Sequence, residues 1–229
     1  MSAYYDAIMT NGYYDYEAIA NELMHYSFSG NSLEVGCGTG LILEELAQRC
    51  STGKIVGIDL TQAMLAIAQE RLRRFSNIQL VLENVLHLSL QQTFNLAFSY
   101  GGVWYFSKDA NAEPVLVSHI VDEGDNHQGL EQVSKHLAPG GSLLLGIQGP
   151  HHDYQAAISG GMTYSQIITP QTTGFIKDYS LSDGATVLMQ QTTQYRTYSF
   201  KQAKAMLATH GLEHQADDIS QLFMEFKKR

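Results

Sequence analysis

The sequence predicts a single α/β domain, residues 1–229, with a mostly parallel β-sheet. Three observations lead to this fold class. Short apolar segments alternate with amphipathic helical segments, a cluster of glycines directly follows the first apolar segment, and segments with a period of two appear only after Gly149. A parallel pair of strands needs a crossover connection, so this alternation is typical of β-α-β units. With 229 residues, 44% of them apolar, the chain can form a complete core.

The first half of the chain reads as a helix followed by alternating strands and helices. Residues 15–27 place Ile19, Leu23 and Tyr26 at helical spacing, so we expect an N-terminal helical cap over residues 1–30. Thr61 can cap the helix that follows the second strand. We expect strands at 32–35, 54–59, 78–85, 94–102 and 142–149, and helices at 41–50, 62–75, 112–122 and 127–137.

The region after Gly149 interrupts this alternation. Residues 174–199 have a period of two and are rich in threonine and tyrosine, with Asp183 and Gly184 at the position of a hairpin turn. We therefore expect residues 150–198 to form an inserted lid of loops and antiparallel strands. Ser199 and Gln202 form a capping box for one more helix, and residues 219–226 predict a last strand.

Charge and cysteine content argue against several classes of partner. The formal net charge is -9 with only 14 lysines and arginines, which disfavours a nucleic acid or an anionic membrane. Two cysteines, Cys37 and Cys50, predict neither a disulfide framework nor a structural zinc site. The tyrosine-rich start lacks the apolar core of a signal peptide, and no apolar run approaches the roughly 18 residues of a membrane span. We expect a cytoplasmic protein, monomer or homodimer, without a metal ion.

The glycine cluster LEVGCGTG, residues 33–40, stands between the first strand and a helix. Backbone N–H groups at such a helix start point outward, and the missing Cβ atoms let a ligand approach closely. A dinucleotide site needs the pattern G-x-G-x-x-G. Gly36 and Gly38 fit that pattern, but its third glycine falls one residue early, at Gly40 in place of Leu41.

The glycine spacing, with Glu34 ahead of it, resembles the first motif of class I S-adenosylmethionine-dependent methyltransferases. The resemblance covers about residues 30–150: Asp59 ends the second strand, and HLAPGG at 136–141 matches the turn before strand five. The C-terminal segment SFKQAKAMLATHGL is also similar to the family. The resemblance implies a Rossmann-like seven-stranded, mostly parallel sheet with helices on both faces, an antiparallel C-terminal strand, and S-adenosyl-L-methionine as cofactor.

The resemblance also assigns roles to single residues. Asp59 would accept hydrogen bonds from both ribose hydroxyls, and Asn84 would accept one from the adenine amino group. The family usually has an acid at position 84 and again at position 95, where this chain has asparagines. Together, the cofactor-binding residues that we expect are Tyr14, Glu34, Gly36, Gly38, Gly40, Asp59, Leu60, Met64, Asn84, Val85 and Ser99.

The acceptor side of the site rests on aromatic residues. Five tyrosines crowd residues 4–16, and in many small-molecule methyltransferases the N-terminal segment folds over the cofactor. A tyrosine ring can cover a sulfonium while its hydroxyl reaches a carboxylate, although packing of a terminal helix is an alternative. Trp104 and Tyr105, beyond strand four, either line the substrate pocket or pack as aromatic anchors.

His151 and His152 are the candidate catalytic residues. They follow strand five at the carboxyl edge of the sheet, where open α/β sheets bind ligands. An imidazole with a pKa near 6.5 can accept a proton at neutral pH, so either histidine can serve as base or orient a hydroxyl or acidic carbon. The alternative is an exposed pair of loop histidines.

These observations predict methyl transfer from S-adenosylmethionine to a small-molecule acceptor, with specialised metabolism as the expected setting. The N-P-P-Y run of base and glutamine methyltransferases is absent from the sequence. Two alternatives stay open. The acid-to-amide changes at Asn84 and Asn95 suit a protein that binds the cofactor without transferring its methyl group, and a protein methyltransferase would need a groove for a peptide.

Overall fold

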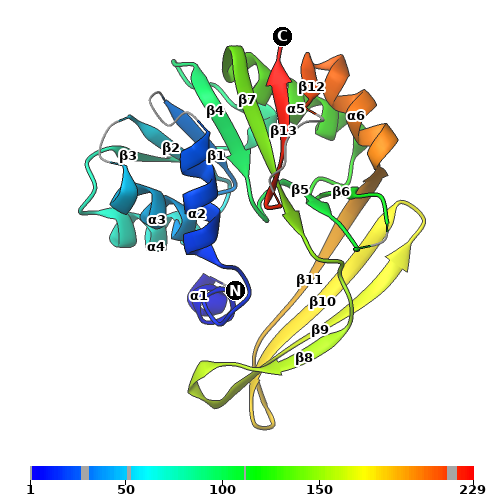
Figure 1. Ribbon diagram of the computed structural model, residues 1–229. Helices are drawn as coiled ribbons and strands as arrows, with labels where there is room; N and C mark the ends of the chain where they lie inside the picture. The colour runs from blue at the N-terminus through cyan, green and yellow to red at the C-terminus, as the bar shows by residue number, and fades with distance from the viewer. Residues whose placement is uncertain (1, 27–30, 51–52, 111, 216–220) are drawn as a thin grey trace.

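The computed structural model describes residues 2–26, 31–50, 53–110, 112–215 and 221–229 (Figure 1). Its helices are α1 (Ser2–Met9), α2 (Tyr16–His25), α3 (Leu41–Arg49), α4 (Gln62–Leu72), α5 (Glu123–His136) and α6 (Phe200–Thr209), with short 3-10 turns η1 (Val85–His87) and η2 (Ser159–Gly161). Its strands are β1 (Ser32–Val35), β2 (Ile55–Asp59), β3 (Ile78–Leu82), β4 (Phe94–Ser99), β5 (Trp104–Ser107), β6 (Val115–Ser118), β7 (Leu137–Gln148), β8 (Tyr154–Ala157), β9 (Met162–Gln171), β10 (Gly174–Asp183), β11 (Thr186–Ser199), β12 (Leu212–His214) and β13 (Phe223–Lys228).

A central sheet of mostly parallel strands forms the body of the molecule. Its order is β3-β2-β1-β4-β7-β13-β12, in which β13 runs antiparallel to β7. The neighbouring pairs among β1, β2, β3, β4 and β7 are all parallel. This arrangement confirms the predicted Rossmann-like sheet with its antiparallel C-terminal strand.

Helices cover both faces of the central sheet (Figure 1). Successive side chains of a strand point to opposite faces, and β7 shows the result: Leu143 and Leu145 pack into a core cluster with α5 and α6, whereas Leu144 packs into a second cluster with α2, α3 and α4. Strands buried on both faces read as continuous apolar runs, which is why the sequence shows them so plainly.

A second sheet begins at the C-terminal end of β7, which pairs with β5. Ile147 and Gln148 pair with β5 in parallel, and the order continues β5-β6-β11-β10-β9-β8 through antiparallel pairs. The predicted hairpin is present, because β10 ends at Asp183 and Gly184 has a φ of +53° in the turn before β11. We call β5, β6 and β8–β11 the second sheet.

Two predicted elements differ from the structure. The helix expected over 112–122 is wrong, because the chain forms strand β6 there and α5 begins only at Glu123. Strand β6 is paired on both sides, with β5 and with β11, and this ladder outweighs the helical spacing of the sequence. Thr61 begins α4 without a side-chain capping bond. The expected last strand, residues 219–226, corresponds to β13. Residues 219 and 220 of that prediction lie outside the described residues, as do residues 1 and 27–30 of the expected N-terminal helical cap.

Helix α1 bridges the two sheets. The Asp6 carboxylate forms an ion pair with Arg71 and accepts a hydrogen bond of 2.6 Å from the Thr39 hydroxyl. On its other side, Ile8 is buried against Tyr164 and Leu181 of the second sheet. Figure 1 shows α1 below α2, beside the lower part of the second sheet. The N-terminal segment therefore packs against the central domain and the insertion at once.

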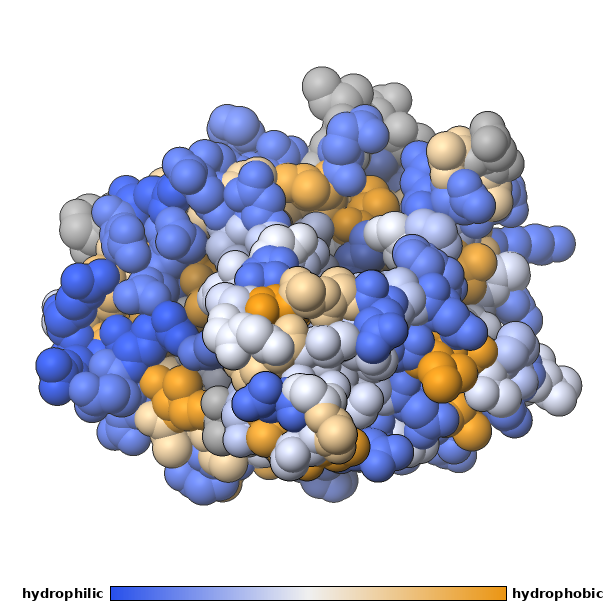
Figure 2. All heavy atoms as spheres, turned by 90° about the horizontal axis from the view of Figure 1, so that it is seen from below, coloured by the Kyte–Doolittle hydropathy of each residue, from blue (hydrophilic) through white to orange (hydrophobic). Residues whose placement is uncertain are grey.

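The face that carries α1 and the tip of the second sheet is seen in Figure 2. Apolar residues form separate small patches there, among hydrophilic ones. Ile167 of β9 and Val187 of β11 are the exposed large apolar side chains of the second sheet. Every helix in the described ranges is too short or too polar to cross a bilayer.

Candidate functional site

The glycine turn between β1 and α3 takes a backbone form that needs glycine. Gly36, Gly38 and Gly40 have φ values of +80°, +54° and +79°, in the left-handed region that side chains disfavour. A Cβ atom on Gly36 would lie 3.0 Å from the Cα of Gly102, and one on Gly40 would lie 2.9 Å from Leu72. On Gly38 it would meet only the Tyr5 ring, at 3.8 Å. Gly38 is therefore the glycine of this turn that leaves space beside it.

A cavity of about 270 Å³ opens at this turn, and we call it the glycine-turn cavity. Parallel strands end at this edge of the sheet, where α/β sheets bind their ligands. Helix α1 reaches it with Tyr5. Six of the expected cofactor-binding residues line it: Gly36, Gly38, Asp59, Leu60, Met64 and Val85.

Asp59 is held in place at the end of β2 by two backbone donors. One carboxylate oxygen accepts from the Gly38 N–H at 2.9 Å, and the other accepts from the Thr61 N–H at 2.8 Å. A carboxylate has about four lone-pair sites, so each oxygen can accept one more hydrogen bond. The carboxylate is thus oriented and still able to bind a diol.

Glu34 of β1 is a buried acid with an unsatisfied oxygen. Its side chain is 3% exposed, and its Oε2 has no hydrogen-bond partner among the described residues. Burial, with a further contribution from the Asp59 charge, raises the pKa of Glu34 to about 8. Glu34 lines a small recess beside the turn, together with Tyr14. A buried acceptor of this kind is suited to a ligand that brings a cation or a donor.

Five expected residues lie outside the glycine-turn cavity. Tyr14 lies deeper and donates a 2.9 Å hydrogen bond to Gln148. Ser99 is buried beneath the Gly102 backbone. Asn84 is exposed, and its Oδ1 accepts from the Leu86 N–H at 3.0 Å, so its side chain caps the turn η1. The neighbouring Glu83 lines the cavity instead. The remaining two are Gly40 and Glu34, of which Gly40 packs against Leu72 and Glu34 faces the recess.

A smaller cavity of about 80 Å³ adjoins the first, and we call it the tyrosine cavity. The two share Tyr5, Gly101, His119 and Tyr179 as lining residues. The N-terminal segment and the second sheet both contribute to its walls. Its other tyrosines are Tyr13, Tyr14, Tyr105, Tyr164 and Tyr195.

The two candidate catalytic histidines lie in different surroundings. His151 lines the tyrosine cavity, with its Nε2 at 2.7 Å from the Tyr105 hydroxyl. Burial lowers the pKa of His151 to about 4, and the positive charge of Lys177 adds to the effect. His152 is exposed, with its Nδ1 at 3.1 Å from the Pro150 carbonyl oxygen. Only His151 can therefore reach a molecule in the cavity.

Trp104 and Tyr105 also have different places. Tyr105 lines the tyrosine cavity. Trp104 lies in the core, fully buried, where its Nε1–H donates to Asn126 at 2.8 Å. The expectation that Trp104 lines a substrate pocket is wrong, because neighbouring residues of strand β5 point to opposite faces.

The sequence reasoning missed His119 and Lys177. His119 follows β6, is exposed, and lines both cavities. No local signal marks it, because its segment resembled a helix. Lys177 lines the tyrosine cavity from β10. Its alternation with Phe175 and Tyr179 could have placed it on the inward face of that strand.

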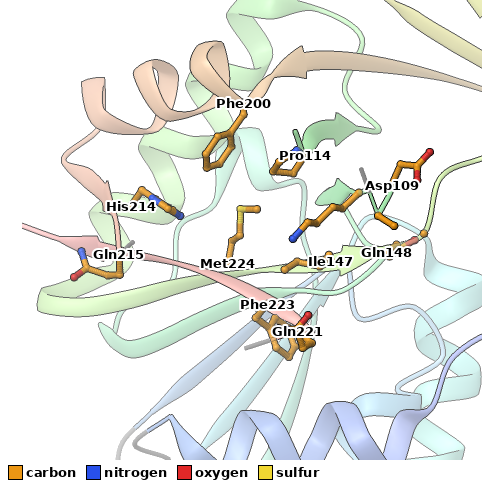
Figure 3. Close-up of a pocket in the computed structure, with 13 residues that line it drawn as sticks. Asp109, Pro114, Ile147, Gln148, Phe200, His214, Gln215, Gln221, Phe223 and Met224 are labelled. Carbon is orange, nitrogen blue, oxygen red and sulfur yellow. The ribbon is translucent and has the colours of Figure 1, made fainter. Parts of the chain in front are cut away.

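A cavity larger than the glycine-turn cavity, of about 660 Å³, lies beside β13 and α6 (Figure 3). Phe200, Phe223 and Met224 line it together with Lys108 and Asp109. No residue of the glycine turn is among its described lining residues. Although this cavity is larger, it is not the candidate site, because it lies away from the glycine turn.

Residues 33–116 match a family model described as a methyltransferase domain. A malonyl-[acyl-carrier protein] O-methyltransferase from Ilyobacter polytropus is 35% identical over 69 residues, which are 30% of this chain and 26% of that protein. The chain thus spans about a quarter of the length of this curated relative.

Solved structures resemble the whole chain at low identity. An S-adenosylmethionine-dependent methyltransferase from Clostridium acetobutylicum has a TM-score of 0.73 and 17% identity, and the match covers 98% of this chain and 96% of that one. An amino pentose methyltransferase from Micromonospora echinaspora, bound to S-adenosylmethionine, has a TM-score of 0.71 and 19% identity with the same coverage. These likenesses show the fold.

Proposed function

We propose that this chain, whose residues 33–116 match a methyltransferase domain, is a class I S-adenosylmethionine-dependent methyltransferase and transfers a methyl group to a small-molecule acceptor. One observation carries the proposal: the glycine-turn cavity adjoins the tyrosine cavity at Gly101 and His119. The first has the residues that the family uses for its cofactor, and the second is small and aromatic. A cofactor and an acceptor in these cavities would meet at their junction.

The residues of the first cavity fit the cofactor. Gly38 leaves space beside the backbone, Asp59 has acceptor sites left for the ribose hydroxyls, and the unsatisfied oxygen of Glu34 suits the amino group of the methionine part. Met64 and Glu83 would hold the adenine from two sides of the cavity. When bound, S-adenosylmethionine supplies an electrophilic methyl group on a sulfonium.

The chain itself contributes alignment and the exclusion of water. Such alignment can supply much of the rate enhancement of a displacement reaction. In this proposal Tyr5 and Tyr179, which line both cavities, enclose the junction, and His119 contacts the reacting group of the acceptor. The Tyr105 hydroxyl and His151 orient the acceptor from the far wall.

The lowered pKa of His151 bears on its proposed role. A catalytic base works best when its pKa lies near the working pH, and a pKa of about 4 leaves His151 a weak base at neutral pH. An orienting role is therefore the better match. An amine acceptor, which needs only an exposed lone pair, would require no base.

Transfer of tritium from S-[methyl-³H]adenosylmethionine tests the function. Purified protein would be incubated with a low-molecular-mass metabolite fraction and, separately, with a dialysed protein fraction. We expect label and S-adenosylhomocysteine to form with the first fraction, and Asp59→Ala to abolish most of the signal. Label in the protein fraction alone would favour a protein methyltransferase. Cofactor binding without any transfer would favour a non-catalytic protein.

A further inference from the structure

Lys177 of β10 is a cation buried in the wall of the tyrosine cavity. Its side chain is 5% exposed, and its Nζ donates a 3.2 Å hydrogen bond to the Tyr13 hydroxyl. The Nζ also lies 5.6 Å from the centre of the Tyr13 ring and 5.4 Å from that of Tyr179. These contacts leave the ammonium facing neutral aromatic groups.

No carboxylate of the described residues pairs with Lys177. The described lining of the tyrosine cavity contains neither aspartate nor glutamate. The adjacent Asp178 is on the other face of β10, where it accepts a hydrogen bond from Thr192. Burial lowers the pKa of Lys177 to about 8, and no neighbouring acid opposes this effect.

The other titratable groups around the cavity are neutral at pH 7. Burial lowers the pKa of His151, and the same effect acts on His119, with Lys177 contributing to both. Burial also raises the pKa values of Tyr13 and Tyr179 above 10. The cavity is thus neutral apart from a single positive charge.

A buried charge without an ionic partner is costly, because it has lost its hydration. A strongly perturbed ionisable group in a cleft is therefore a candidate functional residue. A sulfonium in the neighbouring cavity would add a second positive charge close by. An anionic group on the acceptor would compensate the charge of Lys177, whereas a neutral acceptor would leave Lys177 unpaired in the complex.

We propose that the methyl acceptor carries a carboxylate, and that this carboxylate pairs with the Nζ of Lys177 beside the Tyr13 hydroxyl. The inference rests on the proposed function and adds the chemical class of the substrate. A carboxylate is favoured over a phosphate because the cavity is small and offers one cation, which balances a monoanion. Lys177 is then the residue that selects the acceptor.

Matched pairs of carboxylates and amides test the inference. Acetate and acetamide, benzoate and benzamide, and 4-hydroxybenzoate and 4-hydroxybenzamide would be titrated by NMR into protein saturated with S-adenosylhomocysteine. We expect the wild type to bind the carboxylate of at least one pair about 10- to 100-fold more tightly than its amide, the range for a hydrogen bond to a charged group. This preference should weaken as the pH rises above about 8 and Lys177 loses its proton.

Lys177→Met keeps the length of the side chain and removes the charge. We expect this variant to lose the preference for carboxylates while it binds S-adenosylhomocysteine as the wild type does, which also shows that it is folded. Lys201→Met, an exposed lysine on α6, is the matched control and should keep the preference. Lys177→Gln provides a second neutral variant should the methionine disturb packing.

Three results would overturn the inference. The wild type could show no preference in any of the three pairs, the preference could survive in both Lys177 variants, or Lys201→Met could lose it as well. Failure of the proposed function gives a different result, namely no binding of S-adenosylhomocysteine or no transfer of label to any small molecule. The two failures can therefore be told apart.

Discussion

The Gly38 N–H donates a 2.9 Å hydrogen bond to the carboxylate of Asp59, and so ties the glycine turn after β1 to the end of β2. Two residues expected to bind one cofactor, 21 positions apart, thus share one hydrogen-bond network. The second carboxylate oxygen accepts from Thr61 and orients the start of α4. Asp59 therefore supports the shape of the cavity as well as offering acceptors to a ligand.

Asp59→Ala should weaken the binding of S-adenosylmethionine by about 1.5–3 kcal/mol, the range for hydrogen bonds to a charged group. Titration calorimetry on the folded variant measures this loss. Asp59→Asn, which keeps one acceptor oxygen, should lose less. If Asp59→Ala and wild type bound S-adenosylmethionine equally well, Asp59 would not bind the ribose. Tight binding of NAD to the wild type would instead indicate a dinucleotide site.

Glu83 and Asn84 can be separated by single substitutions. Glu83 lines the cavity, while the exposed Asn84 caps η1. We expect Glu83→Leu to weaken cofactor binding by about 1–3 kcal/mol and Asn84→Leu to weaken it less, since the amide is engaged with Leu86. Asn84→Leu should instead lower the free energy of unfolding by about 0.5–2 kcal/mol, as the loss of a cap does. Calorimetry measures both affinities. If Asn84→Leu bound the cofactor more weakly than Glu83→Leu, Asn84 would be the residue that binds the adenine.

His151→Ala should reduce turnover by about 10²-fold, the cost of a misplaced acceptor, whereas His152→Ala should remain near the wild type because its ring is exposed. Cofactor affinity should be intact in both variants. The neutral form of His151 predominates above its pKa of about 4, so its contribution to the rate should rise with pH through that value and be constant from pH 6 to 8. Near-normal turnover of both variants would exclude a catalytic role for either histidine.

Glu34 should make the stability of the ligand-free protein depend on pH. Its pKa is raised from 4.5 to about 8 on folding, so its contribution to stability is complete below pH 4.5 and is lost as the pH rises towards 8. Glu34→Gln should therefore have a higher melting temperature than the wild type at pH 8 and bind S-adenosylmethionine more weakly. The exposed Glu70 gives a control, Glu70→Gln, that should follow the wild-type profile. The prediction would be contradicted if the melting temperatures of Glu34→Gln and wild type differed by the same amount at every pH from 5 to 8.

The central sheet could be predicted from the sequence because its signals are local. Residues 33–40 combine a buried strand with a glycine turn, and both features follow from neighbouring residues alone. Strand β6 could not be predicted, since its pairing with β11 joins Val115 to Ser199, far apart in the chain. Such pairing is decided by tertiary contacts that a short window of sequence does not contain.

The sequence likewise predicts one part of the candidate site and not the other. Asp59 and Gly38 stand at strand ends, so their meeting follows from the parallel sheet. The tyrosine cavity combines segments as distant as Tyr13 and Tyr195, which only the second sheet brings together. His119 and Lys177 therefore escaped prediction, although the alternation along β10 contained part of the information.

The position of α1 links the exposure of the two cavities. Its Tyr5 lines both cavities, and Asp6 fastens the helix to Thr39 and Arg71. The second sheet, in contrast, is hydrogen-bonded to the central sheet through the pairing of β5 with β7. Undocking of α1 would expose both cavities in one event. In the proposed function, movement of this one short helix would then change the access of cofactor and acceptor together and so couple the entry of one to that of the other.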